Sequence, residues 1–536
     1  MTSTVPPKRV QEAAVTVDVP PTPPLDSRGF FGHPRGLSTL FFTEMWERFS
    51  FYGLRPLLIL YMTAAMASGG FGFERTQASS IVGIYAASVY LASLPGGWIA
   101  DRLLGLRRAI LVGAAFISAG HISIGLSAFA GGRVPFFLGL ALIVMGTGLL
   151  KPNISAIVGD LYPEGGARRD AGFSIFYMGI NLGAFAGQLV TGTLGEKVGW
   201  HFGFGAAGVG MLIGLALFAT RAPRTLGTLG LETSKHPDPQ IQAKQVARAK
   251  LGLGVGLGAL VIVVLLAAFG VITLNAQVIA QNFTYVLVSA GTLYFGYMFF
   301  GAGLTADEKK RVAVILVLFV FSAIFWSAFE QAPTSLNLFA RDFTDRQVGG
   351  FEVPSTWFQS VNSAFIILLA PVFAGIWVKL AKGGLDLSSP SKFALGLVVT
   401  GVGFLLMIYA ANLVVGSGGA AKVSPWWLVW SYFFQTIGEL CISPVGLSSM
   451  TKLSPRRFVG QMMGIWFLAT ALGNLIAGLV GGHVDPEDLA QMPRLFTTTT
   501  VSLVASAVVL ALLIVPIRRM MVKQNSAISH QPSAIS

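Results

Sequence analysis

Charged residues are scarce in this chain of 536 residues, where aspartate, glutamate, lysine and arginine make up only 11% and hydrophobic residues 53%. Soluble globular proteins carry about 25% charged residues, so the deficit argues against a soluble protein. Apolar runs of about 20 residues recur along the whole chain, and each is long enough to cross a bilayer as a helix. The sequence therefore predicts an all-α polytopic membrane protein.

Cysteine is almost absent, and Cys441 is the single one in the chain. One cysteine excludes an intrachain disulfide and a metal site built from several cysteines. The first 35 residues lack the apolar segment of a secretion signal and are rich in proline and polar groups. Residues 1–35 and 519–536 are therefore predicted to be disordered cytoplasmic tails.

The formal net charge of +13 raises the question of nucleic-acid binding. However, the lysines and arginines lie in short loops between apolar spans, and the chain shows no basic face or RNA-binding motif. The sequence therefore argues against a nucleic-acid partner and for membrane lipids as surroundings. The basic loops fall consistently on one side of the spans, so we expect both termini in the cytoplasm.

Fourteen spans are predicted, at 37–64, 78–100, 108–130, 134–159, 170–194, 201–220, 250–273, 282–303, 311–340, 355–381, 391–414, 424–450, 457–481 and 493–517. The apolar stretches of the seventh and eighth spans, 255–274 and 283–300, and the loop between them carry no charged residue, whereas polar residues recur in the six spans on either side. The two halves also share a weak sequence similarity, because GGWIADRL ends the second span and AGIWVKLA ends the tenth. This arrangement favours two six-helix bundles, 36–220 and 304–518, joined by a cytoplasmic linker, 221–249, and an inserted two-helix hairpin, 250–303, with a site between the bundles at mid-membrane.

The first span, FFTEMWERFSFYGLRPLLILYM, carries four ionisable residues, Glu44, Glu47, Arg48 and Arg55. On an ideal helix these residues and Tyr52 fall within about 140° of one face. An ionisable group at bilayer depth is costly unless it faces a wet cavity or a partner. The clustering predicts a polar lumen along this face. The alternative is a structural ion pair that only holds the helices together.

Three later spans each carry one isolated charge: Lys151, Glu330 and Glu439. A lone buried charge must be neutralised by another helix, by protonation or by a ligand. The lumen would thus offer cations from the first half and carboxylates from the second, which suits a zwitterion. An extended dipeptide holds its ammonium and carboxylate groups about 5–7 Å apart.

Other residues in the spans are candidates for contacts with the rest of such a substrate. The aromatic residues predicted to line pockets for its side chains include Tyr90, Trp326 and Trp466. Asn181 and Asn362, which lie near Tyr177 and Gln359, add hydrogen-bonding groups. These amides either line the lumen or hold neighbouring helices together.

Several motifs resemble those of one transporter family. Glu44-Met-Trp-Glu47-Arg48 resembles the ExxER motif of the proton-dependent oligopeptide transporter family, a branch of the major facilitator superfamily. FYMGINLG, 176–183, is similar to the family's FYxxINxG signature, 97–108 resembles the facilitator loop after the second helix, and GELCISPVGLSSMTKLSP resembles the tenth core helix. The resemblance covers about 34–518 and implies a major facilitator fold with fourteen transmembrane helices. The inserted hairpin is similar to that of bacterial members, which implies a bacterial cytoplasmic (inner) membrane.

The resemblance implies proton-driven uptake of di- and tripeptides, and of peptide-like drugs, by a monomeric carrier that is not an enzyme. Protons are the coupling ion and no other cofactor is expected. Proton coupling is implied for Glu44, Glu47 and Arg48. The residues implied for substrate binding are Arg48 and Lys151 at the peptide carboxylate, Glu439 and Asn362 at the ammonium, and Tyr52, Tyr90, Asn181 and Trp466 along the site. The implied gating ion pairs between the halves are Arg55–Glu330 and Lys151–Glu439.

The chain departs from the family's pattern at two positions. Phe51 stands where most members have tyrosine, and Ser363 follows Asn362 in place of the usual proline. Both departures bear on side-chain preference and on the straightness of the helix at 362. The alternatives are a relative that carries another anion such as nitrate, a drug exporter of the facilitator type, and a membrane enzyme, for which no phosphate loop, paired histidines or serine elbow is found.

Overall fold

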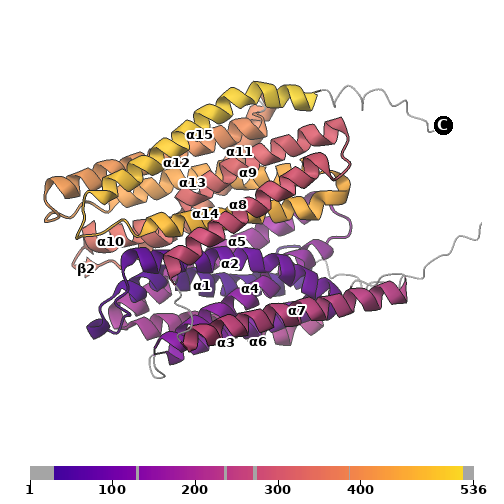
Figure 1. The fold of residues 1–536 in the computed structure, drawn as a ribbon, viewed down its shortest axis with the longest axis horizontal. Coiled ribbons are helices and arrows are strands. Elements are labelled where there is room, and N and C mark those ends of the chain that lie inside the picture. Colours follow the sequence, from indigo (N-terminus) through magenta and orange to yellow (C-terminus); the bar gives the residue numbers. More distant parts are fainter. Residues whose placement is uncertain (1–28, 128–131, 234–237, 270–274, 385–386, 523–536) are drawn as a thin grey trace, which may run out of the picture.

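The computed structural model describes residues 29–127, 132–233, 238–269, 275–384 and 387–522, and nearly all of them lie in helices (Figure 1). The helices of the first half are α1 Arg35–Thr63, α2 Arg75–Ile99, α3 Leu106–Leu126, α4 Arg133–Asp160, α5 Gly166–Thr193 and α6 Trp200–Thr225. The inserted pair is α7 Pro239–Ala268 and α8 Ala276–Phe300. The helices of the second half are α9 Ala306–Phe329, α10 Asn337–Phe343, α11 Trp357–Lys382, α12 Ser389–Gly416, α13 Trp426–Leu453, α14 Val459–Gly481 and α15 Gln491–Val522. Two short antiparallel strands, β1 Gln347–Val348 and β2 Phe351–Glu352, lie between α10 and α11.

The predicted all-α polytopic fold is confirmed in the described residues, where fourteen long helices match the fourteen predicted spans and α10 is a short extra segment. Helices of 21 to 32 residues are about 31–48 Å long, which exceeds the thickness of a bilayer core. Eleven helical segments of this part are long and apolar enough to cross a membrane. The helices outside that set are α1, which carries the four ionisable residues noted above, α7 and α13.

The helices of each half pack against one another. In the first half α1 contacts α5 and α6, and α3 contacts α4 and α6; in the second, α12 contacts α13 and α15, and α9 contacts α14 and α15. Figure 1 shows the first half, in indigo and purple, below the second half, in orange and yellow. Contacts of α2 with α14 and of α5 with α11 join the two halves.

The inserted pair touches both halves. Arg102, just after α2, donates a hydrogen bond to Gln245 on α7, and α8 contacts α2, α9 and α14. The Tyr294 hydroxyl of α8 also donates to Gln461 of α14 at 3.1 Å. Helix α6 extends to Thr225 and α7 begins at Pro239, so helices occupy part of the segment 221–249 predicted as a linker. Helix α15 likewise continues to Val522, into the predicted tail 519–536, and residues 1–28 and 523–536 of the two predicted tails lie outside the described residues. The other domain boundaries stay predictions.

Glycine allows α2 and α14 to touch backbone to backbone. A Cβ atom on Gly478 would lie 2.6 Å from Gly83 Cα, and one on Gly83 would lie 2.8 Å from Gly478 Cα. Ser79 Oγ, one turn away on α2, donates to the Gly478 carbonyl at 2.6 Å. Small residues permit such close helix packing, and any side chain here would part the two halves.

The path from α9 to α10 is interrupted at the level of the predicted site. Helix α9 ends at Phe329, and Glu330 and Gln331 lead into a π-helical turn, Ala332–Leu336, that contains Pro333. Proline cannot donate a backbone hydrogen bond, and π-helical turns are frequent at functional sites. The interruption leaves the Glu330 side chain facing the first half.

The single cysteine lies inside the second half. Cys441 belongs to α13, and its side chain has 0% of its surface exposed. It behaves as a small apolar residue of the core, as the sequence indicates.

Candidate functional site

A cavity of about 240 Å³ lies between the two halves. Nine predicted site residues line it: Tyr52, Arg55, Tyr90, Asn181, Trp326, Glu330, Asn362, Glu439 and Trp466. They come from α1, α2 and α5 of the first half, and from α9, α11, α13 and α14 and the segment after α9 of the second. Four predicted residues do not line the cavity: Glu44, Glu47, Arg48 and Lys151.

These four residues form a charged cluster inside the first half. Arg48 Nε lies 2.9 Å from Glu44 Oε1 and 2.5 Å from Glu47 Oε2, and all three residues are almost fully buried. Lys151 is close enough to interact electrostatically with both carboxylates, and its ammonium lies 4.2 Å from the centre of the Tyr90 ring. Since Tyr90 lines the cavity, the cluster lies directly behind the cavity wall.

Several buried polar atoms of the cluster have no hydrogen-bond partner among the described residues, and they include both Nε and Nη2 of Arg48. Nε is the atom that lies against the two carboxylates. A buried guanidinium nitrogen without a partner is costly, so Nη2 is suited to an acceptor that arrives from the cavity.

Phe51 lies between the cluster and the next arginine of α1. The guanidinium of Arg48 lies 5.3 Å from the centre of the Phe51 ring, and that of Arg55 lies 5.4 Å from it. Cation–π contacts of this kind stabilise an arginine on an apolar surface. The phenylalanine that departs from the family's tyrosine therefore contacts both arginines.

Arg55 and Glu330 pair across the cavity. Arg55 Nη2 lies 2.5 Å from Glu330 Oε2, and the same nitrogen donates to Asn474 Oδ1 at 3.3 Å. Both charged side chains are at most 6% exposed. This ion pair and the amide from α14 tie α1 to the second half.

The other predicted gating pair is not formed in this conformation. Among the described residues no ion pair joins Lys151 to Glu439, and the pairing stays a prediction. Glu439 Oε2 instead accepts a hydrogen bond from Asn362 Nδ2 at 3.3 Å, and the same nitrogen donates to Thr436 Oγ1 at 2.9 Å. Helix α11 continues through Ser363 without a break, as the missing proline suggests.

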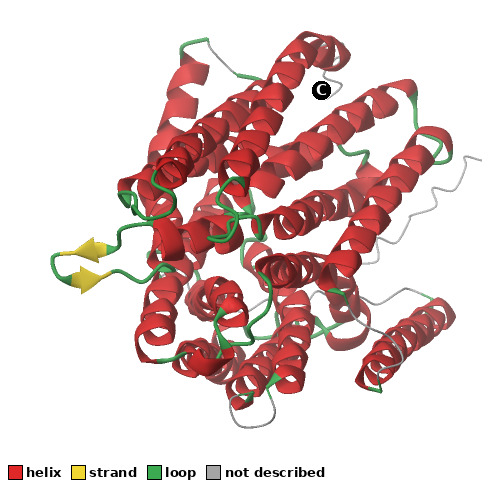
Figure 2. Ribbon diagram, turned by 60° about the vertical axis from the view of Figure 1, so that its left-hand side comes forward, coloured by secondary structure: helices red, strands yellow, loops and turns green. Residues whose placement is uncertain are grey.

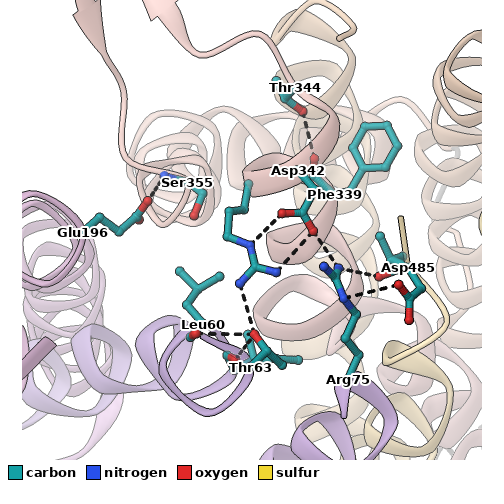
Figure 3. A network of polar contacts seen from close by, with 12 residues as sticks. Leu60, Thr63, Arg75, Glu196, Phe339, Asp342, Thr344, Ser355 and Asp485 are labelled. Atoms are coloured by element: carbon teal, nitrogen blue, oxygen red, sulfur yellow. Dashed lines mark hydrogen bonds and ion pairs between the residues drawn. The ribbon is translucent and has the colours of Figure 1, made fainter. Parts of the chain in front are cut away.

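The end of the molecule that carries β1 and β2, here called the β-hairpin end, is closed by ion pairs between the halves (Figures 2 and 3). Arg75 Nη1 of α2 lies 2.6 Å from Asp342 Oδ2 of α10, and Arg75 Nε lies 3.7 Å from Asp485 Oδ1. Arg341 Nε also contacts Asp342, at 2.8 Å, and Arg341 Nη1 donates to Thr63 Oγ1 of α1 at 3.1 Å. The cluster links α1 and α2 with two segments of the second half, α10 and the turn after α14.

A second group of polar contacts lies beside the strands. Glu196, after α5, accepts hydrogen bonds from the backbone N–H groups of Ser355 and Thr356 at 2.8 and 3.0 Å. Lys197 Nζ lies 2.7 Å from Glu352 Oε2. The hydrogen bond from Lys197 and the charge of Arg346 lower the pKa of the Glu352 carboxyl. These contacts bind the strand segment to the first half.

The opposite end of the cavity reaches solvent. Tyr177 lines the cavity and is 42% exposed, and it lies nearer the start of α5 than Asn181. No residue of α11 after Ile366 is buried. The cavity is thus closed at the β-hairpin end and accessible from the other.

Sequence reasoning missed several polar residues of the site. Gln188, Tyr432 and Thr470 line the cavity, and Asn474 contacts Arg55. Helical spacing could have found two of them, because Gln188 lies seven residues after Asn181 on α5 and Thr470 four residues after Trp466 on α14. Tyr432 follows a run of aromatic residues and carries no such signal.

Comparisons with known proteins agree with this architecture. The sequence profile of the POT family matches residues 107–495. "Peptide transporter YePEPT" of Yersinia enterocolitica subsp. palearctica is 52% identical over 498 residues, which cover 92% of this chain and 96% of the relative. A di-/tripeptide transporter of Lactococcus lactis subsp. cremoris is 38% identical over 457 residues, covering 83% and 89%. The crystal structure of peptide transporter POT in complex with sulfate matches with a TM-score of 0.83 and 43% identity, covering 92% of this chain and 97% of the other.

These matches extend over both halves and the inserted pair, so they confirm the predicted major facilitator fold. With a family profile that covers most of the chain and a relative more than half identical to it, the chain belongs to the POT family.

Proposed function

We propose that this protein is a proton-coupled symporter that imports di- and tripeptides by alternating access. The observation that carries the proposal is the cavity between the halves. Its lining includes Glu439 and the Arg55–Glu330 pair, and Arg48 and Lys151 lie behind its wall. Separated charges of opposite sign fit a zwitterion. A simple anion carries no positive group that could bind the Glu439 carboxylate. The printed names of the relatives, which are peptide transporters, support the same substrate class.

The peptide is held at its two ends. Its ammonium binds Glu439, which already accepts from Asn362, and its carboxylate binds the unpaired Arg48 Nη2 and Lys151 once the Tyr90 ring moves aside. Charge-assisted hydrogen bonds at both ends are stronger than neutral ones and fix the direction of the peptide. Peptide-like drugs that keep both charges bind in the same way.

The carrier functions as a monomer with protons as its coupling ion and needs no other cofactor. Its cavity opens alternately at the two ends while the halves rock around the bound peptide. The ion pairs at the β-hairpin end and the exposed Tyr177 at the other end support assigning the present conformation to one of these two states.

Uptake of labelled dialanine into proteoliposomes tests the function. We expect accumulation with an inward proton gradient and mere equilibration without it. Unlabelled dialanine should compete strongly, whereas N-acetyl-dialanine should compete at least tenfold less well, because its capped nitrogen leaves the Glu439 carboxylate without a charged partner. Equal competition by the two peptides would reject the role of Glu439, and no uptake of dialanine under either condition would reject the function itself.

The same proposal places the chain in the cytoplasmic (inner) membrane of a bacterium with both termini in the cytoplasm. The bias of lysine and arginine between the loops supports this orientation. The cavity of the present structure then faces inward, and the β-hairpin end faces the periplasm. Reporter fusions at either terminus should be active only with a cytoplasmic reporter. Activity of a periplasmic reporter at either end would contradict the orientation.

A further inference from the structure

Four neutral polar side chains line the cavity near the β-hairpin end: Gln188 of α5, Gln359 of α11, and Tyr432 and Gln435 of α13. Each is at most 6% exposed. Each also has a polar atom without a hydrogen-bond partner among the described residues: Gln188 Oε1, Gln359 Nε2, the Tyr432 hydroxyl and Gln435 Oε1. Buried polar atoms in folded proteins almost always have partners, so these four are suited to a ligand. We call this group the neutral chamber.

The neutral chamber lies on the β-hairpin side of the groups proposed to hold the ammonium. Helices α11 and α13 begin at the β-hairpin end, so Gln359 precedes Asn362 by about 4.5 Å along α11, and Gln435 precedes Glu439 by about 6 Å along α13. Helix α5 ends at the β-hairpin end, where Trp357 Nε1 of α11 donates to the Thr193 hydroxyl at 2.9 Å. These offsets are one helical turn, or about the length of a side chain.

No net charge falls within the chamber itself. The charged residues that line the cavity are Arg55, Glu330 and Glu439, and the first two neutralise each other at 2.5 Å. Glu439 is occupied by the peptide ammonium in the proposed function. A charged side chain entering the chamber would therefore lose its hydration without gaining an opposite charge.

We propose that the neutral chamber binds the first side chain of the peptide and favours one that carries an amide, as in asparagine or glutamine. This inference rests on the proposed function. With the ammonium on Glu439 and the carboxylate across the cavity toward Arg48 and Lys151, the backbone leads away from α13. The side chain on the first Cα is then the substituent closest to the chamber.

An amide matches the chamber because both offer donors and acceptors. A side-chain amide has two N–H donors and a carbonyl that accepts, whereas the chamber offers the acceptors Gln188 Oε1 and Gln435 Oε1, the donor Gln359 Nε2 and the Tyr432 hydroxyl, which can do either. Leucine has nearly the shape of asparagine but no polar atoms. It would displace water and leave the chamber's polar atoms without partners.

Competition with dialanine uptake tests the inference on the unmodified protein. Asn-Ala should inhibit at about tenfold lower concentration than Leu-Ala, because discrimination by sites built for hydrogen bonds comes from the groups left unpaired. Reversing the order should remove most of this difference, so Ala-Asn and Ala-Leu should inhibit nearly alike. Equal inhibition by Asn-Ala and Leu-Ala, or an equal preference at the second position, would overturn the inference.

Variants test whether the residues of the neutral chamber cause the preference for Asn-Ala over Leu-Ala. Gln359→Met and Gln188→Met keep the side-chain length but remove the amides, so each should lower the ratio of Asn-Ala to Leu-Ala potency, and the double variant should bring it near one. Gln461→Met, the same change where α14 meets α8 outside the cavity, should keep the ratio. An unchanged ratio in the double variant would also overturn the inference.

Failure of this inference is separable from failure of the proposed function. If the wild-type protein takes up dialanine but shows no preference for Asn-Ala, the chamber assignment alone is wrong. If it does not take up or bind dialanine at all, the proposed function is wrong. A binding measurement on purified protein with the four peptides gives the same ratios without relying on transport.

Discussion

Replacing Glu47 with glutamine should abolish proton-driven accumulation of peptide while exchange of peptide for peptide continues. In the structure Glu47 and Glu44 share Arg48 Nε at 2.5 and 2.9 Å, in a place with almost no exposed surface. A proton can enter such a site only by competing with the ion pair. In the proposed function, protonation would free Arg48 for the peptide carboxylate, and loss of the proton would restore the pair and release the peptide. Glutamine mimics the protonated state permanently.

The expected effect is large because the gradient supplies much energy. One pH unit contributes about 1.4 kcal/mol per proton and 100 mV about 2.3 kcal/mol. Together they support accumulation of several hundredfold, which the Glu47→Gln variant should reduce to simple equilibration. The measurement is internal against external dialanine in proteoliposomes with an imposed gradient, followed by exchange against preloaded unlabelled peptide.

Glu352→Gln provides the matched control, since that carboxylate lies at the exposed β-hairpin end in a pair with Lys197. Surface ion pairs contribute about 0–1 kcal/mol, so this variant should accumulate peptide nearly as well as the wild type. Glu44→Gln belongs in the same series, because both carboxylates lie against Arg48 Nε. Normal accumulation by both Glu44→Gln and Glu47→Gln would contradict the coupling mechanism.

Replacing Gly478 with leucine should also stop uptake, by a different route. Even a Cβ atom there would lie 2.6 Å from Gly83 Cα and 2.9 Å from the Ser79 carbonyl, and neither is a side chain that can turn away. Overpacking costs about 1–3 kcal/mol, which disfavours the conformation closed at the β-hairpin end by about five- to 150-fold. Uptake should fall by about tenfold or more, and Gly478→Ala should have a smaller effect.

Uptake by Gly478→Leu should be lost because the two halves cannot close, and not because the protein fails to fold. Gly478→Leu should still bind dialanine in detergent, since the cavity residues are unchanged. Gly375→Leu is the matched control, because that glycine lies on α11 with no atom within 4 Å of its ideal Cβ position, and it should transport normally. Full uptake by Gly478→Leu would show that α2 and α14 need not touch during transport.

Much of the architecture could be predicted because the suitability of a segment for the bilayer depends on the polarity of its own residues. Apolar runs, the charge bias of the loops and the lone charges are all local features of the sequence, and the fourteen long helices follow them closely. The face of α1 that carries Glu44, Glu47, Arg48 and Arg55 was also predictable, because helical geometry fixes which residues share a face.

What could not be predicted depends on how distant segments meet. Arg75 and Asp342 lie in short segments that carry charges of both signs, and Asp485 lies in an acidic one. Only the packing of the halves brings the three residues together. The interruption after Phe329, which brings Glu330 to Arg55, likewise has no local signal beyond Pro333. Which cations reach the cavity also depends on side-chain positions, as Tyr90 beside Lys151 illustrates.

The burial of Cys441 makes this chain convenient for spectroscopy. A thiol-reactive probe reacts with accessible thiolates, and the only native thiol has no exposed surface. Cysteines introduced at Lys197 and Glu352, which lie on opposite halves and are partly exposed, would therefore be the sites that take up label. Spin labels or fluorophores at such a pair would follow the separation of the two halves in the natural background, without first removing a cysteine.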